Sequence, residues 1–154
     1  MPESLKSRTV RFLFNLYPCY RRTGVRITYV SADFDEVRIR LPLNWKTRGY
    51  NGTMFGGSMY GSIDPVYVVM FSLNLGKRYV AWDKAATIEF RKPGRETLYS
   101  TFRFAAGELD GIRNELETSE KVERVYDVDL CDAAGVVHAH FRKTIQIRRR
   151  TPPA

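Results

Sequence analysis

The chain has 154 residues, a length suited to one domain with a buried core, and its 25 Lys and Arg outnumber 17 Asp and Glu to give a formal net charge of +8. The longest uninterrupted apolar run, residues 66–71, is too short to cross a membrane. The N-terminus lacks the apolar block of a signal peptide, and Cys19 and Cys131 share no metal-ligand spacing. We therefore expect a reduced, cytoplasmic protein whose positive charge attracts anionic partners.

Residues 1–20 predict a helix followed by a turn. Ser4 is suited to the N-cap, the helix would run to about Leu16, and Pro18 would end it. The helix has a rough apolar side, which is formed by Leu5, Val10, Phe12, Leu13 and Leu16.

Six later segments have the alternation or the composition of β-strands. They are residues 25–30, 36–43, 78–92, 97–104, 124–132 and 136–148. A short surface helix is expected between the fourth and the fifth, over residues 107–121, because its first turn is acidic. The first two strands predict one hairpin and the last two predict another. Residues 149–154 are expected to form a flexible tail.

The last strand carries its apolar side chains on one face. That face is formed by Val137, Ala139, Phe141, Ile145 and Ile147, and the other by His138, His140, Arg142, Thr144 and Gln146. Two histidines at spacing i, i+2 can hold a metal ion, but no third ligand accompanies them. We therefore predict no metal site, and we expect the two histidines to be exposed or to lie at an interface.

The most apolar segment, residues 66–75, follows a glycine-rich stretch and is closed by Gly76 as a C-cap. A helix that is apolar nearly all round has to be surrounded by the rest of the domain. An antiparallel sheet of about six strands curled around one helix achieves this. The predicted fold class is therefore α+β, with residues 1–154 as a single domain.

The role of Asp64 depends on where this helix begins. Asp64 and Pro65 suit the N-cap and the first position of a helix. Alternatively the helix begins near Gly56 and Gly57, and Asp64 lies two turns further, on the same side as Gly57. Pro65 would then lie inside the helix and free the carbonyl of residue 61. In this second arrangement the glycine amides stabilise an oxyanion and the carboxylate attacks a carbonyl or activates water. The spacing alone leaves the two arrangements open.

Several stretches resemble the hotdog-fold acyl-CoA thioesterases. The segment NGTMFGGSMYGSID, residues 51–64, is similar to the family motif Asn-x-x-Gly-x-x-His-Gly-Gly followed by six residues and Asp. The stretches NLYP, RLPL, GTMFGGSMY, WDKAATIEFRKPG and the final IRR resemble an uncharacterised bacterial branch of that superfamily. The resemblance covers about residues 15–149, and it implies a hotdog fold: a sheet of about six strands around a central helix.

The resemblance also assigns roles to individual residues. Asp64 takes the place of the family's catalytic carboxylate, and Gly57 that of the glycine whose amide polarises the thioester carbonyl. Asp83 falls on the strand from which related enzymes position the attacking water, and it would come from the neighbouring subunit. The chain departs from the motif at two positions, because Phe55 stands in place of the His and Gly49 in place of a polarising Asn.

The substrate implied by the resemblance is an acyl-CoA or a related acyl thioester, with coenzyme A as part of the substrate and no separate cofactor. Coenzyme A carries several phosphate charges, which suit basic side chains at strand ends. The residues expected to bind substrate are Asn51, Thr53, Phe55, Gly56, Tyr60, Arg91, Lys92 and Arg95. The protein would be a homodimer or a dimer of dimers.

Two alternatives to hydrolysis follow from the same features. Hotdog domains also serve as non-catalytic modules that bind acyl-CoA or lipid, so the fold alone does not decide the activity. The net charge of +8 would suit a nucleic-acid binder, but no helix-turn-helix, zinc motif or aromatic RNA-binding signature is present. We therefore predict a thioester hydrolase first, a binding module second, and no nucleic-acid partner.

Overall fold

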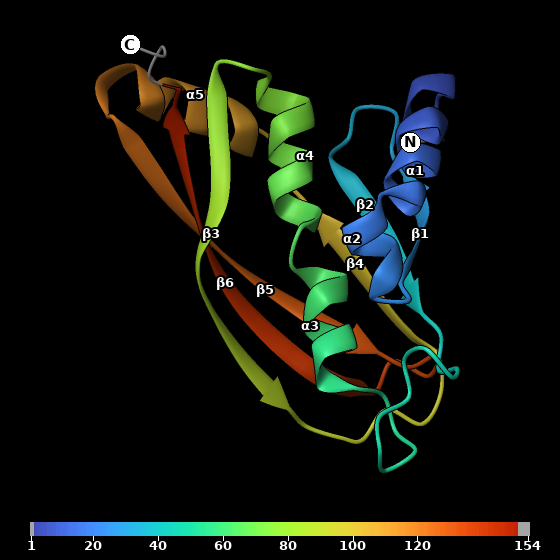
Figure 1. Cartoon of the computed structure of the whole chain (residues 1–154). Helices are drawn as coiled ribbons and strands as arrows, with labels where there is room; N and C mark the ends of the chain where they lie inside the picture. Colours follow the sequence, from blue (N-terminus) through green and yellow to red (C-terminus); the bar gives the residue numbers. More distant parts are fainter. Residues whose placement is uncertain (1, 151–154) are drawn as a thin grey trace.

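The computed structural model describes residues 2–150 (Figure 1). Five helices and six strands follow one another along these residues. They are α1 (Leu5–Leu16), α2 (Pro18–Arg22), β1 (Arg26–Val30), β2 (Glu36–Leu41), α3 (Gly56–Ile63), α4 (Val66–Leu75), β3 (Tyr79–Phe90), β4 (Leu98–Arg103), α5 (Glu108–Thr118), β5 (Lys121–Cys131) and β6 (Val137–Arg149).

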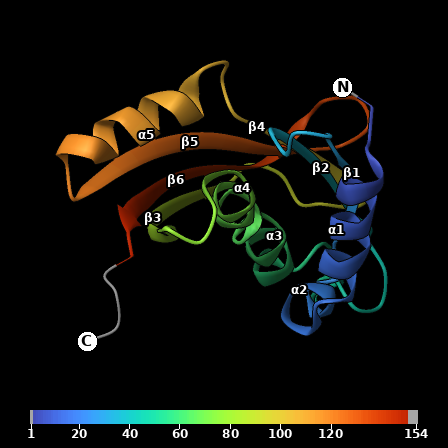
Figure 2. The same ribbon diagram turned by 90° about the horizontal axis from the view of Figure 1, so that it is seen from above.

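The six strands form one sheet in the order β1-β2-β4-β5-β6-β3, and each neighbouring pair is antiparallel. The sheet curves around α4, and α5 lies along β5 (Figure 2). The 12-residue strand β3 forms one edge of the sheet and pairs with β6. An antiparallel sheet wrapped around a central helix is the hotdog fold, so the predicted fold class is confirmed.

The core lies between the concave side of the sheet and the central helix. Phe71 and Met70 of α4 are almost completely buried, as are Phe141 and Ile145 of β6. Burying one such side chain stabilises the folded state by about 1.5–3 kcal/mol. This packing fixes α4, and with it the end of α3, against β6 and β3.

Of the apolar side of α1 that the sequence indicates, only Val10 packs against the core. Ser4 caps the helix as predicted, with its side chain accepting from the Ser7 amide at 3.1 Å. The side that packs inward carries Ser7, Val10 and Phe14. The exposed residues of the predicted apolar side are Leu5, Phe12, Leu13 and Leu16.

The C-terminal end is more ordered than the sequence indicates. The strand β6 runs to Arg149, and the Arg150 amide donates to the Arg78 carbonyl at 2.8 Å. The predicted flexible tail therefore does not begin at Arg149, and its remaining part, residues 151–154, lies outside the described residues. Within residues 2–150, no helix is long and apolar enough to cross a membrane.

Candidate active site

The central helix is broken at Asp64 and Pro65, and both predicted arrangements are partly realised. The first helical segment, α3, begins at Gly56, as the second arrangement required. The backbone of Asp64 is helical and its amide donates to the Tyr60 carbonyl at 2.9 Å, so Asp64 ends α3 and does not cap α4. A new segment, α4, begins after Pro65 because proline has no amide to continue the first one.

Side chains from other elements satisfy the carbonyls at this break. The Tyr20 hydroxyl of α2 donates to the Ser62 carbonyl at 3.0 Å. The ammonium group of Lys143, on β6, donates to the carbonyls of Ile63 and Asp64. Buried carbonyls without partners are costly, so these contacts stabilise a helix break that proline makes unavoidable.

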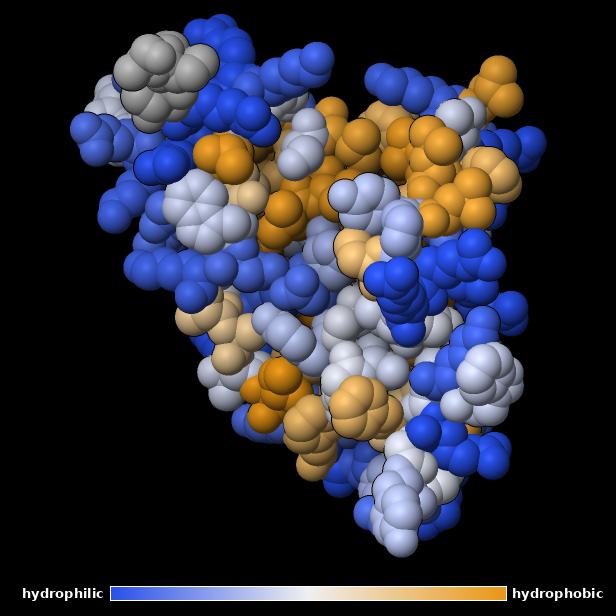
Figure 3. All heavy atoms as spheres, in the orientation of Figure 1, coloured by the Kyte–Doolittle hydropathy of each residue, from blue (hydrophilic) through white to orange (hydrophobic). Residues whose placement is uncertain are grey.

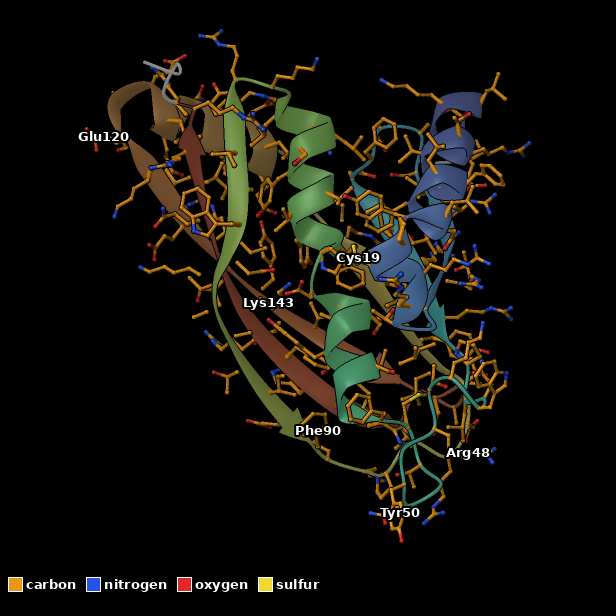
Figure 4. All side chains as sticks on the ribbon, in the orientation of Figure 1. Cys19, Arg48, Tyr50, Phe90, Glu120 and Lys143 are labelled. Carbon is orange, nitrogen blue, oxygen red and sulfur yellow. The ribbon has the colours of Figure 1, made fainter. Side chains whose placement is uncertain are left out.

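Lys143 is the charged side chain of this candidate site that the sequence analysis missed. Its side chain is fully buried, and Nζ lies 3.0 Å from Oδ2 of Asp83. The signal was present in the sequence, because strict alternation places Lys143 on the same face of β6 as Phe141 and Ile145. Figure 4 shows Lys143 lying on the inner side of the sheet, close to the junction of α3 and α4.

Asp83 faces this centre from β3, just before an irregularity in the strand. Asp83 pairs with Ile145 and Ala85 pairs with Thr144, so Lys84 is an extra residue in β3. Such a bulge re-aims the side chains that follow it. Asp83 precedes the bulge and faces inward by regular alternation with the buried Ala81, while the extra residue, Lys84, forms an ion pair with Glu123 at 2.6 Å.

Asp83 and Asp64 of the same chain interact. Burial raises the pKa of Asp83, the ammonium group of Lys143 opposes that shift, and the neighbouring charge of Asp64 adds to it. The other carboxylate oxygen of Asp83, Oδ1, is buried without a hydrogen-bond partner among the described residues. The sequence analysis expected Asp83 from a second subunit, whereas here the pair forms within one chain.

Tyr60 completes this polar centre from α3. It lies one helical turn before Asp64, and its ring stacks on Phe141 with 6.4 Å between ring centroids. Burial, followed by the charge of Asp64 and a hydrogen bond to it and by the charge of Asp83, raises the pKa of Tyr60 to about 12. Tyr60 therefore stays a hydrogen-bond donor to Asp64 at neutral pH.

The N-terminus of α3 has the open amides that the glycine motif predicts. Gly56 and Gly57 are its first two residues, and the amides at these positions have no acceptor within the helix. A Cβ atom at Gly57 would lie 2.3 Å from the ring of Phe55, and one at Gly56 would lie 3.1 Å from the ring of Phe90. Two aromatic rings therefore pack directly on the glycine backbone, which leaves no space for a side chain there.

A hollow of about 380 Å³ adjoins this helix N-terminus. It is lined by Thr53, Met54, Gly56, Met59 and residues 90–94. Four of the predicted substrate-binding residues thus meet here: Thr53, Gly56, Arg91 and Lys92. Two others, Asn51 and Arg95, are exposed and do not line this hollow.

A histidine holds the loop that forms one wall of this hollow. The predicted exposure of His138 is wrong, because its imidazole is buried between the Pro93 carbonyl and Asp132, at 3.2 Å from each. The His138 carbonyl also accepts the amides of Arg91 and Lys92. His140 lies nearer the surface, with its ring 2.7 Å from the Asp129 carboxylate.

Comparison with known proteins gives the chain a family. The model of the family described as Domain of unknown function (DUF4442) matches residues 6–147. No curated protein matches the chain.

Solved structures share the fold over nearly the whole chain. A protein of unknown function from Pseudomonas aeruginosa, described as a probable thioesterase, is 21% identical with a TM-score of 0.83, covering 97% of this chain and 99% of its own. A protein of unknown function from Chlorobaculum tepidum is 14% identical with a TM-score of 0.76, covering 94% and 95%. A thioesterase from Haemophilus influenzae is 13% identical with a TM-score of 0.70, covering 96% and 93%. At these identities the likeness shows a shared fold.

Proposed function

The chain belongs to the DUF4442 family, and we propose that it hydrolyses the thioester bond of an acyl-CoA or a related acyl thioester. One observation carries the proposal: a pair of interacting carboxylates, Asp64 and Asp83, lies two helical turns from an open helix N-terminus. Asp64 lies seven positions after Gly57, which is about 10 Å along the axis. A thioester carbonyl bound at the Gly57 amide and one water molecule fit into that span. The distance therefore favours Asp64 as a general base over direct attack by its carboxylate.

The proposed reaction uses the two carboxylates in different protonation states. Asp64 accepts a proton from water while the water oxygen bonds to the thioester carbon, and the resulting oxyanion is stabilised by the Gly57 amide. The intermediate then collapses, the carbon–sulfur bond breaks, and sulfur leaves with the electron pair. Protonated Asp83 donates its proton to that sulfur, and the proton held by Asp64 passes across the pair to Asp83. One water and one thioester thus give one acid and one thiol.

The charge balance of the site supports a single shared proton. Two carboxylates and one ammonium group, on Lys143, leave one uncompensated negative charge in a mostly buried site. Adding one proton makes the cluster neutral, which avoids the cost of a buried net charge. The raised pKa of Asp83 points to Asp83 as the group that holds this proton.

The hollow beside Gly56 is the proposed entry site for the substrate. Arg91 and Lys92 line it and would bind phosphate groups of coenzyme A, with Arg95 nearby on the same loop. Thr53 and Asn51 offer polar groups beside it, and the rings of Phe55 and Tyr60 would contact the acyl portion. Arg91 already forms an ion pair with Glu89 at 3.0 Å, so phosphate binding there replaces one charge partner with another.

A homodimer, or a dimer of dimers, is part of this proposal. One side of β3 pairs with β6, and no strand covers its other side in the part of the chain that the structure describes. A long uncovered edge strand is a template for pairing with a second chain. Pairing of two β3 strands would place two sites on one continuous sheet.

The competing proposal is a module that binds acyl-CoA or lipid without turnover. The position of Phe55 favours it, because this aromatic ring packs on Gly57, whose amide the reaction needs. The Phe55 side chain is exposed, and the competing proposal requires it to stay in place when ligand binds. Hydrolysis requires it to move aside.

Thioester hydrolysis over a panel of acyl-CoA chain lengths tests the proposal, with detection of the free thiol. Wild-type protein would be compared with Asp64→Asn, and coenzyme A binding would be measured for both. We expect the variant to fold and bind while its turnover falls at least about 100-fold, in keeping with the loss of a general base. Tight binding with no turnover by the wild-type protein would contradict hydrolysis and establish the binding module.

A further inference from the structure

The helix α1 has two apolar faces, and only one of them is covered. Val10 and Phe14 pack against the core. The uncovered face, called the α1 stripe, consists of Leu5, Phe12, Leu13 and Leu16. These side chains are 84%, 62%, 59% and 46% exposed, respectively. Because their spacing is i, i+7, i+8 and i+11, they form one continuous line along the helix.

Aromatic side chains extend the α1 stripe beyond the helix. Tyr17 follows it directly and is 60% exposed, and Trp45, from the segment between β2 and α3, is 83% exposed. A hollow of about 600 Å³ joins the two regions, and it is lined by Leu16, Pro18, Arg21, Arg22, Trp45 and Lys46. Figure 3 shows apolar side chains gathered over α1 with hydrophilic ones at the margins.

The chain segment that carries the stripe has nearly all its charges positive. Residues 2–30 contain six Lys and Arg against a single acid, Glu3. Glu3 forms an ion pair with Arg11, in which Nε of Arg11 lies 2.8 Å from Oε1 of Glu3. Lys6 and Arg8 flank Leu5 on opposite sides of the helix. Lys6 Nζ lies 5.3 Å from the centre of the Phe34 ring, and Arg8 Nε lies 3.8 Å from a carboxylate oxygen of Glu3. The region therefore combines exposed apolar and aromatic side chains with a basic margin.

This combination fits an anionic lipid surface better than a second copy of the chain. A symmetric dimer through the α1 stripe would bring two identical basic margins against each other. A bilayer containing anionic lipids offers negative headgroups to the basic side chains and an apolar layer beneath them for the stripe. Tyr17 and Trp45 suit the level of the headgroups, where amphipathic rings are favoured.

We propose that the α1 stripe docks this protein on the surface of an anionic bilayer, with Phe12, Leu13 and Leu16 inserted among the lipids and Arg21 and Arg22 on the headgroups. The protein lies on the membrane and does not span it. The proposal goes beyond thioester hydrolysis and rests neither on that activity nor on coenzyme A binding.

Co-sedimentation with vesicles tests the proposal. The full chain would be mixed with phosphatidylcholine vesicles, and with vesicles in which about a third of the lipid is phosphatidylserine, at low and high salt. Wild-type protein is expected to sediment with the anionic vesicles only, and to be released by salt. The variant Phe12→Ser/Leu13→Ser is expected to lose at least about tenfold in partitioning.

Matched controls separate the stripe from general effects. Tyr99→Ser/Val125→Ser removes exposed apolar side chains elsewhere and is expected to partition like the wild type. The double variants Arg21→Glu/Arg22→Glu and Lys77→Glu/Arg78→Glu change the net charge equally, but only the first removes the basic side chains that the proposal places on the headgroups. Only the first pair is expected to abolish binding. Circular dichroism would confirm that each variant is folded.

Two results would overturn the proposal. One is equal partitioning of wild type and Phe12→Ser/Leu13→Ser, or no partitioning of either, because the stripe would then make no contact with lipid. The other is a higher oligomer in sedimentation velocity that Phe12→Ser/Leu13→Ser dissociates. In that case a second copy covers the stripe.

Discussion

Lys143 satisfies, with one ammonium group, three acceptors at the centre of the molecule: the carbonyls of Ile63 and Asp64 and Oδ2 of Asp83. The side chain has no exposed surface, so no water replaces it when it is removed. A buried charge is tolerated only when it is paired and hydrogen-bonded. The same residue therefore stabilises the helix break and sets the charge of the carboxylate pair.

The variant Lys143→Met is predicted to lower the free energy of unfolding by about 3 kcal/mol at neutral pH, since it leaves the Asp64–Asp83 carboxylate pair without the ammonium group that balances its negative charge. Because the pKa of Asp83 is already raised in the folded protein, folding favours the protonated group, and stability is lost as pH rises through that pKa. Removing Lys143 raises this pKa further. The stability that Lys143→Met loses should therefore be smaller in acid than at neutral pH. Urea unfolding of the wild type and the variant at both pH values measures this difference.

The neighbouring residue Lys84 provides the matched control. Its ammonium group also pairs with a carboxylate, that of Glu123, but both side chains are substantially exposed. Lys84→Met is expected to change the free energy of unfolding by less than about 1 kcal/mol. Equal losses for the two methionine variants, or a loss at Lys143 that does not depend on pH, would contradict the role given to the buried pair.

At the scale of elements, α1 is attached to the sheet through polar side chains as well as packing. Asn15 accepts the Ile27 amide at 2.8 Å and donates to the Ile27 carbonyl at 3.0 Å. Glu3 accepts the Val30 amide at 3.0 Å. Both side chains bond the outer edge of β1, so they satisfy backbone groups that an edge strand leaves unpaired.

The variant Asn15→Ala is predicted to destabilise the protein by about 1–3 kcal/mol, because both groups of Ile27 lose their partner. Hydrogen exchange should show faster exchange of the Ile27 amide, with urea unfolding giving the overall loss. Thr9→Ala, on the exposed side of α1, is the control and should change stability by no more than about 0.5 kcal/mol. Unchanged exchange at Ile27 in Asn15→Ala would show that packing alone holds α1.

At the scale of the whole molecule, the proposed assembly depends on the free edge of β3. Ala85, Ala86 and Thr87 in the middle of this strand are small and exposed. Small side chains let another backbone approach closely, so this segment is suited to pairing with the same segment of a second chain. The two sites of such a dimer would lie on one sheet.

The variant Ala85→Lys/Thr87→Lys is predicted to shift the protein from dimer to monomer, because like charges would meet across the paired edges. Sedimentation velocity over a range of protein concentrations measures this shift. Val125→Lys, on β5, adds a charge away from the edge and should leave the dimer intact. A dimer that survives both lysines at the edge would place the interface elsewhere.

The sequence by itself determined the strands, the central helix and the fold, because these follow from local periodicity, turn residues and the amount of apolar side chain to be covered. A resemblance also led to the prediction of Asp64 and Gly57 as site residues, although spacing left the start of the helix open. The structure contains both a helix that begins at Gly56 and a break at Pro65, because the chain forms two helical segments, α3 and α4, in place of one.

Only the tertiary structure decided which groups meet. Alternation along β3 turns Asp83 inward, but only the packing of β3 and β6 against the helix break brings it to Lys143 and Asp64 of the same chain. Lys143 reaches the carbonyl of Asp64 because β6 passes beneath the helix break, a contact between residues about 80 positions apart. The α1 stripe was apolar in sequence, yet whether it faces the core or the solvent depends on which side of α1 the sheet occupies. The periodicity of the sequence determines which side chains share one face of a helix or strand. The packing of segments distant in the sequence determines what that face contacts.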